Sequence, residues 1–526
     1  MGNIYSEEQL LSFSGLDGGT GFSGMLTFLS LRERFALRLV RPRVGGSLHF
    51  ADSGREVEIY SDHADFGSSR MVLPDCYHIL VRGPVECREL DPELYRLETR
   101  GDLTLLGVRE HFDPAWLDAD FAALYEQCEK RLDAMPDFGV TDADTAKTLR
   151  RAWSLLRGCI YAPDRDFPEG FWATPDRWPH KGCWIMDSVY QALAMKYADR
   201  RVAFEMINAL FAHQCPDGKI PMCFSPEWSA RCHIQQPVIA AGFKAVGITD
   251  DELLRVFPKL DAFLKWVFIH RDADGDGLLE WLMAGGTPDC TCGESGMDNS
   301  PRFDARNTLA SVDLNSFMSL ECEIMAQFAA RCGREADRRY YLARHEQLNA
   351  RIESTLWSDE MGIYTDMDIA TGALVPVSAV SGFLPLICGA ASPERAAVLA
   401  AHVRNPDTYG TPYPLPSVSR SDPKFQMDMW RGPVWHIFNY HAAEGLDRYG
   451  YHAEADLIRR RTVEAGVKNY LAYGGFFEFY DPAGVVPPGK IDRKGPNVID
   501  DYGFHRAVHD YGWSAAIFID MLYKSR

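Results

Sequence analysis

From about residue 111 onward the chain is a succession of amphipathic helical segments, and this feature constrains its fold more than any other. Apolar residues recur at the spacing of a helix that packs on one side. The spacing, with its capping and terminating residues, predicts twelve helices, near residues 142–159, 188–198, 201–214, 237–246, 250–270, 314–332, 335–356, 377–388, 393–403, 432–449, 452–470 and 513–524. Twelve helices with short returns on one side and long connections on the other suit a closed double ring of six helix pairs.

A helical-repeat solenoid is the competing architecture for such a chain. Solenoids show similar segments at a fixed period, and the sequence contains no internal repeat of that kind. We therefore expect one large mainly α domain over residues 111–526.

The first 110 residues have a different pattern. Short segments at 35–39, 56–60 and 103–108 are separated by Gly, Pro, Asp and Ser. This spacing is typical of antiparallel strands joined by turns. Residues 1–110 are predicted to form a small N-terminal β module.

The net charge excludes some classes of partner. Against 74 acidic residues the chain carries 55 Lys and Arg, a formal charge of −19. Since a polyanion would be repelled, we expect neither nucleic acid nor an anionic membrane as a partner. The sequence also has no signal-peptide pattern and no apolar run of about 20 residues, which predicts a cytoplasmic protein.

Cysteine usage indicates reduced thiols and no structural metal. There are 13 cysteines, an odd number, and no repeated CxxC pair. No P-loop or dinucleotide-binding fingerprint is present either. The sequence predicts no cofactor and no metal.

One acidic segment, DADGDGLLE at 272–280, is similar to the opening of a calcium-binding loop. The twelfth position of such a loop should be a bidentate Glu, and here it is Met283. A tight Asx–Gly turn is the preferred interpretation, with calcium as the alternative.

The long connections between the predicted helices are the strongest functional signal from residue type alone. Those at 171–187, 214–236, 272–314, 412–433 and 473–511 are rich in aromatic, acidic, His and Gln residues. Aromatic faces stack on sugars, and carboxylates and amides bind sugar hydroxyls. The tryptophans that we expect on these connections are Trp172, Trp178, Trp184, Trp228, Trp430 and Trp435, and core packing is the alternative role for each.

Cleavage of a glycosidic bond needs one protonated carboxyl and one ionised carboxylate on opposite sides of the sugar. Asp298, in the polar loop ESGMDNSPRFD at 294–304, is the first candidate for the proton donor. Its counterpart is Glu478 in GGFFEFYDP at 474–482, where glycines allow close backbone approach and aromatics surround the carboxylate. Glu294, Asp304 and Asp481 remain rivals, because loop carboxylates commonly cap helices or pair with Arg.

Several of these motifs together resemble glycoside hydrolase family 63, a family of inverting α-glycosidases, and its bacterial relatives. The relatives include mannosylglycerate and glucosylglycerate hydrolases, with trehalases more distant. The resemblance rests on five motifs in order, ESGMDNSPR at 294–302, DLNS at 313–316, WRGPVW at 430–435, FEFYDP at 477–482 and YGW at 511–513. It covers roughly residues 145–525.

The resemblance implies an (α/α)6 barrel with Asp298 as general acid and Glu478 as general base. It also implies a sugar-binding subsite formed by Trp184, Asp187, Gln236, Arg302, Trp430 and Trp435. One departure is Met186, where the family pattern has a tryptophan before the Asp. A methionine stacks on a sugar less well than an aromatic ring, so the choice between glucose and mannose stays open.

These observations predict an inverting, exo-acting α-glycosidase that hydrolyses a small soluble α-glucoside or α-mannoside. Glucosylglycerate, mannosylglycerate and an α-linked disaccharide are the candidate substrates. For inversion the two carboxyl groups should be roughly 6.5 to 9.5 Å apart. The alternatives are a sugar phosphorylase or epimerase on the same barrel, and a non-catalytic carbohydrate-binding protein.

Overall fold

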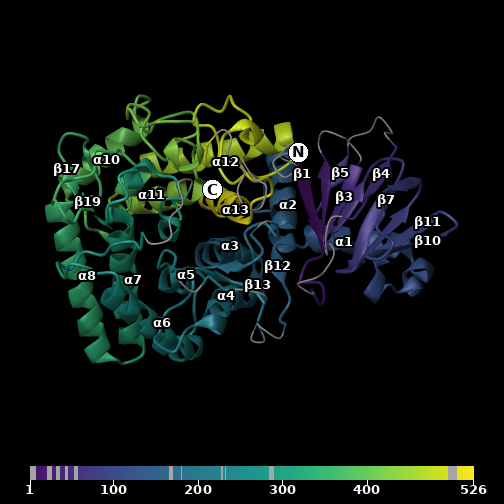
Figure 1. Ribbon diagram of the computed structural model, residues 1–526, viewed down its shortest axis with the longest axis horizontal. Coiled ribbons are helices and arrows are strands. Elements are labelled where there is room, and N and C mark those ends of the chain that lie inside the picture. The colour runs from purple at the N-terminus through teal and green to yellow at the C-terminus, as the bar shows by residue number, and fades with distance from the viewer. Residues whose placement is uncertain are drawn as a thin grey trace.

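The computed structural model describes residues 8–20, 26–30, 36–41, 45–51, 57–164, 167, 170–178, 180–226, 229–230, 233–283, 290–495 and 506–526. Figure 1 shows a small β part at the right and a large helical part at the left. The molecule is therefore mainly helical with an N-terminal antiparallel β module, as the sequence predicts.

The β module consists of two antiparallel sheets. The five-stranded sheet has the order β1-β2-β3-β4-β9 and the six-stranded sheet the order β10-β11-β8-β7-β6-β5. Apolar side chains from both sheets, among them Leu11, Leu48, Ile79 and Leu106, form one buried cluster. The strands are β1 (Glu8–Ser12), β2 (Leu26–Ser30), β3 (Ala36–Arg41), β4 (Ser47–Phe50), β5 (Glu58–Ile59), β6 (His63–Asp65), β7 (Arg70–Asp75), β8 (His78–Arg82), β9 (Val85–Arg88), β10 (Tyr95–Arg100) and β11 (Leu103–Val108).

A helix that the sequence pattern did not predict, α1 (Phe121–Asp133), packs on the six-stranded sheet. Asp120 caps its first turn by accepting from the backbone of Ala122 and Ala123. Its buried Phe121 and Cys128 join Val72 and Leu80 in a separate apolar cluster. By its packing, this helix belongs with the β module although it follows residue 110.

The twelve predicted helical segments correspond to α2–α13. The helices are α2 (Ala143–Gly158), α3 (Ile185–Ala198), α4 (Arg200–Asn208), α5 (Ile239–Ala245), α6 (Asp250–His270), α7 (Val312–Arg331), α8 (Glu335–Thr355), α9 (Pro385–Cys388), α10 (Pro393–Arg404), α11 (His436–Arg448), α12 (His452–Tyr473) and α13 (Gly512–Lys524). Asp142 caps α2, and Thr249 with Glu252 forms a capping box on α6.

Two boundaries differ from the prediction. The segment 377–388 is a 3-10 turn, Val380–Phe383, followed by the short α9, since Pro385 lacks the N–H that a continuous helix would use. Helix α11 begins at His436 rather than at 432, because the chain up to Trp435 is extended and Val434 pairs with Tyr480.

Contacts between helices follow a closed cycle. Helix α3 packs on α5, α5 on α7, α7 on α9, α9 on α11, α11 on α13, and α13 back on α3. The other helices pack outside this cycle, for example α4 on α3, α8 on α7 and α12 on α11. This is the order expected for an inner ring of six helices with an outer ring around it.

The connections between these helices contain short strand pairs. They are β12 (Ile160–Tyr161) with β13 (Trp172–Ala173), β14 (Cys183–Trp184) with β15 (Cys223–Phe224), β16 (Leu309–Ala310) with β19 (Met367–Asp368), and β17 (Trp357–Ser358) with β18 (Ile363–Tyr364). Among the described residues, none of the helices is both long enough and apolar enough to cross a membrane. The twelve cysteines in the described part of the chain are free thiols, as predicted.

Candidate active site

Connections that precede the inner helices meet in one region. The Gln236 side chain, before α5, donates to the carbonyl of Ser295, before α7. The backbone N–H of Trp430, before α11, donates to Oδ1 of Asn299 at 3.0 Å. The segment around Glu478 pairs through its backbone N–H with the carbonyl of Val508, before α13. The first two bonds hold together loops far apart in sequence, and the third lies within the connection 473–511.

Asp298 lies in this region with its carboxylate partly accessible. Its side chain is 19% exposed, and Oδ2 is 2.9 Å from Nζ of Lys494. The backbone is held as well, because the Asp298 carbonyl accepts from the N–H of Thr291 at 2.8 Å. The loop therefore presents a fixed carboxyl group whose contact is an ammonium.

Glu478 is buried and paired with Arg493. The guanidinium donates from Nε to Oε2 at 3.0 Å and from Nη2 to Oε1 at 3.4 Å. The guanidinium thereby contacts both oxygens of the carboxylate. An ionised carboxylate is the form that a general base requires.

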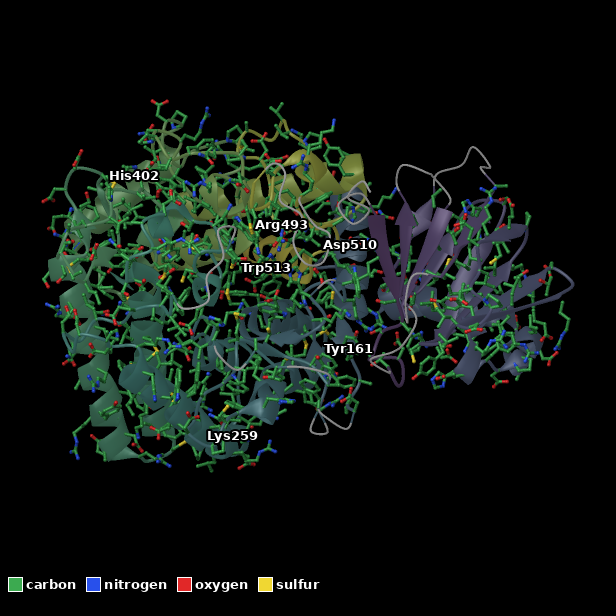
Figure 2. The ribbon with its side chains drawn as sticks, viewed as in Figure 1. Tyr161, Lys259, His402, Arg493, Asp510 and Trp513 are labelled. Atoms are coloured by element: carbon green, nitrogen blue, oxygen red, sulfur yellow. The ribbon has the colours of Figure 1, made fainter. Side chains whose placement is uncertain are left out.

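The partners of the two carboxylates are consecutive residues. Arg493 contacts Glu478, and Lys494 contacts Asp298. Consecutive Cα atoms are about 3.8 Å apart, so both carboxylates lie within side-chain reach of one short segment. In the view of Figure 2, Arg493 and Trp513 are labelled in the interior of the drawn molecule, while Lys259 and His402 mark the periphery of the helical part.

Sequence reasoning missed both cations, although it singled out the connection 473–511 that contains them. Both cations could have been predicted, because Arg493 and Lys494 are adjacent and lie in the same connection as Glu478. Two carboxylates in one site repel each other, and adjacent cations can offset that repulsion.

The three rival carboxylates have other roles. Glu294 is fully buried and binds Arg271 together with the backbone N–H groups of Ile234 and Leu282. Asp304 pairs with Arg431 through both oxygens. Asp481 accepts from the backbone N–H groups of Ala483, Val485 and Val486. Each of the three fixes a loop.

Asp187, in the first turn of α3, is a buried carboxyl group beside Glu478. Burial, followed by the negative charges of Asp176 and Glu478, raises the pKa of Asp187 well above its ordinary value, and nearby His180 opposes this. Nδ1 of His180 lies 2.7 Å from a carboxylate oxygen of Asp176. Burial opposes a positive charge on His180, but Asp176 outweighs it and raises the pKa of that imidazole.

Several predicted sugar-binding residues carry a buried polar atom with no hydrogen-bond partner among the described residues. They are Nε1 of Trp184, Oδ1 of Asp187, Oε1 of Gln236, Nε of Arg302 and Nε1 of Trp430. Buried polar atoms normally have a hydrogen-bond partner, so a group of unsatisfied atoms needs an explanation. Hydroxyl groups both donate and accept, and a sugar could satisfy donors and acceptors alike.

Trp430 and Trp435 are stacked on each other rather than spread along a cleft. Their ring centroids are 3.6 Å apart with an interplanar angle of 5°, and each residue is 1% exposed. Nε1 of Trp435 donates to the carbonyl of Met429 at 3.0 Å. The pair therefore packs into the core, and its contact with a sugar stays a prediction.

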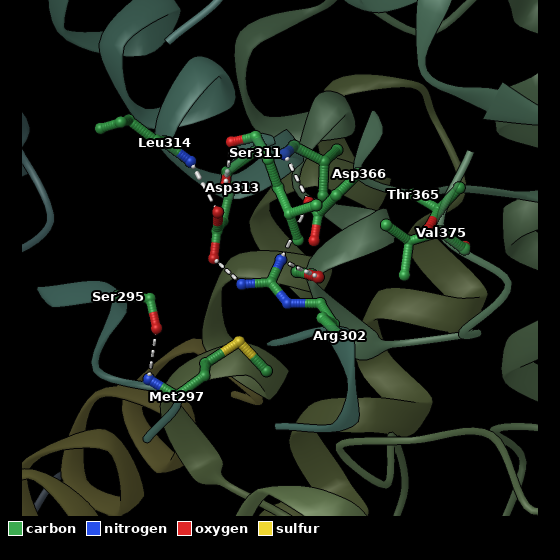
Figure 3. A network of polar contacts seen from close by, with 12 residues as sticks. Ser295, Met297, Arg302, Ser311, Asp313, Leu314, Thr365, Asp366 and Val375 are labelled. Atoms are coloured by element: carbon green, nitrogen blue, oxygen red, sulfur yellow. Dashed lines mark hydrogen bonds and ion pairs between the residues drawn. The ribbon is translucent and has the colours of Figure 1, made fainter. Parts of the chain in front are cut away.

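Arg302 forms a buried network, which Figure 3 shows. Its guanidinium donates to Asp313 at 2.6 Å, to Asp366 at 3.2 Å and to Ser381 at 2.9 Å. Asp366 also accepts from the backbone N–H of Val312, at the start of α7. These contacts tie the loop after Asp298 to the inner helix, and they occupy most of the guanidinium that we predicted to bind substrate.

Other predicted residues have different surroundings. Trp172 is buried between Tyr161 and Phe167, with stacked rings at 4.2 and 4.3 Å, so it packs in the core. The Nζ of Lys181 lies 4.4 Å from the ring centroid of Trp178. Trp228 lies outside the described residues.

The acidic segment 272–280 forms the predicted turn. Asp274 accepts from the backbone of Asp276, and Asp276 from that of Leu278. The carboxylates of Asp272, Asp274 and Asp276 each offer an oxygen within 4.8 Å of the others, an arrangement that could hold a cation. Arg351 pairs with Asp276.

The chain is similar to known glycoside hydrolases. The family model described as the mannosylglycerate hydrolase MGH1-like glycoside hydrolase domain matches residues 180–514. Mannosylglycerate hydrolase MGH2 of Selaginella moellendorffii is 28% identical over 443 residues, which cover 68% of this chain and 83% of that protein. A mannosylglycerate hydrolase of Thermus thermophilus is 27% identical over 57% of this chain and 88% of its own length.

Solved structures show the same fold. The crystal structure of a GH63 mannosylglycerate hydrolase from Thermus thermophilus in complex with Tris matches with a TM-score of 0.58 and 22% identity, over 72% of this chain and 99% of that one. The neutral trehalase of Saccharomyces cerevisiae matches with a TM-score of 0.55 and 20% identity, over 68% and 74%. Because the matched family model covers more than half of the chain, residues 180–514, the chain belongs to the MGH1-like glycoside hydrolases of family 63.

Proposed function

We propose that this protein is an inverting, exo-acting α-glycosidase that hydrolyses a small soluble α-glucoside or α-mannoside, with glucosylglycerate, mannosylglycerate and α-linked disaccharides as candidates. The observation that carries the proposal is the pairing of Asp298 and Glu478 by consecutive cations, in a region with unsatisfied polar groups. The cyclic contacts of the inner helices support an (α/α)6 barrel as the scaffold.

The chemistry assigns one role to each carboxyl group. Glu478, paired with Arg493, takes a proton from a water molecule that attacks the anomeric carbon. Asp298 gives its proton to the departing glycosidic oxygen on the other side of the sugar. The bond from the anomeric carbon to that oxygen breaks as the bond to water forms, and the configuration inverts.

Asp187, Gln236 and Trp184 are proposed to bind the sugar hydroxyls through their unsatisfied atoms. Asp187 is well suited because its raised pKa keeps a proton on the carboxyl group at higher pH than usual. A protonated carboxyl group can donate to one hydroxyl and accept from another.

The test is hydrolysis of a panel of α-glucosides and α-mannosides, including glycerate and disaccharide aglycones, followed by proton NMR. We expect the β anomer of the sugar to appear first. Asp298→Asn and Glu478→Gln should each reduce kcat by about 10² to 10⁴. Asp298→Asn should leave the unfolding temperature nearly unchanged, whereas Glu478→Gln should lower it, because buried Arg493 loses its charged partner. First release of the α anomer, or wild-type turnover by either variant, contradicts the mechanism.

A sugar phosphorylase is the second candidate, because Arg493 and Lys494 are the kind of cations that bind phosphate. In that case turnover would depend on inorganic phosphate and yield a sugar phosphate. We expect the same rate with and without phosphate, since Glu478 already occupies Arg493.

A further inference from the structure

A buried group of three metal-ligand side chains lies in the β module, apart from the proposed active site. His63 begins β6 directly after Asp62, and Cys128 is on α1. A carboxylate oxygen of Asp62, a ring nitrogen of His63 and the sulfur of Cys128 all lie within 4.8 Å of one another. All three residues are buried. A carboxylate, an imidazole and a thiol are the ligand types that bind zinc in proteins.

The three groups are joined through hydrogen bonds to Asp62. Nδ1 of His63 lies 2.7 Å from Oδ1 of Asp62, and the Cys128 thiol donates to the same carboxylate. Burial raises the pKa of the thiol, and the charge of Asp62 adds to this, so the thiol keeps its proton. Two protons, one on nitrogen and one on sulfur, are therefore shared with one carboxylate. A single divalent cation in their place would contact the same three groups.

Glu129, also on α1, orients the His63 ring from its other side. Its Oε1 lies 2.6 Å from Nε2 of His63, so both ring nitrogens face carboxylates and both carry a proton. Burial opposes this positive charge, but Asp62 and Glu129 outweigh burial and raise the pKa of His63. With a metal on Nδ1, the ring would still donate from Nε2 to Glu129. A carboxylate behind a ligating histidine is usual at metal sites, because it fixes the tautomer and the ring.

The charges of the three side chains allow protons to be exchanged for a divalent cation. Burial opposes ionisation of Asp62, but His63 outweighs burial and lowers the pKa of that carboxyl group. Without metal, the charges of ionised Asp62, protonated His63 and neutral Cys128 sum to zero. With Zn²⁺, ionised Asp62, neutral His63 and a Cys128 thiolate the sum is again zero. Metal binding therefore buries no additional net charge.

Two arginines lie near this group, and their charge is shared with another carboxylate. Nη1 of Arg131 is 3.8 Å from Oδ2 of Asp62, and Arg157 also lowers the pKa of Asp62. Both guanidiniums pair with Asp17, Nε of Arg131 at 3.3 Å and Nη2 of Arg157 at 2.6 Å. Asp17 therefore offsets part of the repulsion that a metal ion would meet.

We propose that Asp62, His63 and Cys128 form a zinc-binding site in the β module. Zn²⁺ binds a carboxylate oxygen of Asp62, Nδ1 of His63 and Sγ of Cys128, and a water molecule is the fourth ligand. Binding forms a Zn–N bond and a Zn–S bond and releases two protons to solvent, one from Nδ1 and one from the thiol. A thiolate and an imidazole select zinc over calcium and magnesium.

The ion would fasten α1 to the six-stranded sheet, because Cys128 is on the helix and His63 is on β6. The site is one side chain away from solvent, since the Glu129 side chain is 33% exposed. Cysteine spacing could not indicate this site, because Cys128 and His63 are far apart in sequence. The inference does not depend on the proposed glycosidase activity.

The experiment titrates the full-length protein, cleared of metal with a chelator and kept reduced, with Co²⁺ and then with Zn²⁺. A cobalt–thiolate bond gives a charge-transfer absorption band that oxygen and nitrogen ligands do not give. The test variant is Cys128→Ser. Cys87→Ser is the matched control, because Cys87 is a partly buried cysteine of the same module, on β9. Asp272→Asn is the second control, because Asp272 belongs to the other group of three such ligands among the described residues, a group without sulfur.

We expect the wild type to bind one cobalt ion per chain with a thiolate band, to release two protons per ion near neutral pH, and to lose the band when zinc is added. Cys128→Ser should lose the band and bind zinc at least about tenfold more weakly. Cys87→Ser and Asp272→Asn should keep both properties. Excess Ca²⁺ or Mg²⁺ should not displace the cobalt.

A wild type without a thiolate band, or a band that Cys128→Ser keeps, overturns the inference. If Cys128→Ser does not fold, X-ray absorption of the zinc-loaded wild type decides instead. One sulfur neighbour at about 2.3 Å, with nitrogen and oxygen neighbours at about 2.0 Å, is expected. A shell of nitrogen and oxygen alone, or one with several sulfurs, overturns the inference. None of these measurements uses a glycoside, so their outcome is separate from that of the proposed function.

Discussion

At the residue scale, the site contains carboxyl groups that occupy two different environments. Asp298 and Glu478 each contact a cation, whereas Asp187 is buried with one oxygen unsatisfied. Keeping an unpartnered carboxyl group buried costs stability, and active sites commonly accept such a cost. Substitution of Asp187 should therefore lower activity while it increases the stability of the fold at higher pH.

Asp187→Asn tests this divergence. We expect kcat/KM to fall at least about tenfold, because the amide nitrogen cannot accept a hydrogen bond from a sugar hydroxyl, whereas both oxygens of a carboxyl group can. The folded-state pKa of Asp187 is raised, so its favourable contribution to stability is present below the unfolded pKa and is lost as pH rises through the folded pKa. The variant should therefore gain unfolding temperature relative to the wild type as pH rises from about 5 to 8. A variant that loses stability throughout this range contradicts the assignment.

At the element scale, side chains from one inner helix fix the start of the next. Glu321, on α7, accepts from the backbone N–H groups of Ala240 and Ala241 in the first turn of α5, at 2.8 Å each. These N–H groups lack intrahelical partners, which is why a carboxylate stabilises them. Gln236 lies three residues before α5, so the cap also positions a predicted sugar-binding residue.

Glu321→Ala should lower the free energy of unfolding by about 1 to 3 kcal/mol, because two buried N–H groups lose their acceptor. It should also raise KM, since Gln236 loses its support. Thr249→Ala is the control, as it removes the cap of the outer helix α6 at about 1 kcal/mol and touches no proposed site residue. Thermal unfolding and steady-state kinetics measure both effects. An unchanged KM in Glu321→Ala would show that the cap does not position Gln236.

The helix pattern was predictable at this scale because amphipathic spacing is a local property. Helix α6 begins and ends where the sequence pattern places it. Helix α9 is only four residues long because it begins at Pro385, which lacks an N–H, and ends at Gly389, whose φ of +77° is left-handed. The sequence pattern did not predict helix α1. Its apolar side chains pack on the six-stranded sheet, and the sequence does not show where that sheet lies.

At the scale of the whole molecule, a buried ion pair within the helical part also holds the first strand of the β module. Arg151, on α2, lies 2.5 Å from Asp510, and both side chains are fully buried. Asp510 also accepts from the backbone N–H of Leu10, in β1, at 2.6 Å. In Figure 2, Asp510 lies on the side of the helical part that faces the β module.

Asp510→Ala should reduce the free energy of unfolding by about 3 to 5 kcal/mol, because it leaves Arg151 buried without its partner. Asp118→Asn is the matched control. Asp118 pairs with Arg100 at an exposed position, where the loss should be under about 1 kcal/mol. Denaturant unfolding compares the two variants. Equal small losses would mean that the interface does not depend on this ion pair.

The sequence by itself determined the order of helices, the N-terminal β module and the two carboxylates proposed for catalysis. These follow from local periodicity, turn residues and short motifs, which depend on neighbours along the chain. Only the tertiary structure decided that Arg493 and Lys494 pair with those carboxylates, that Trp430 and Trp435 stack on each other, and that Arg302 is engaged by Asp313 and Asp366. The physical reason is that ion pairing and burial depend on distances between loops far apart in sequence, which are fixed only when the helices close into a ring.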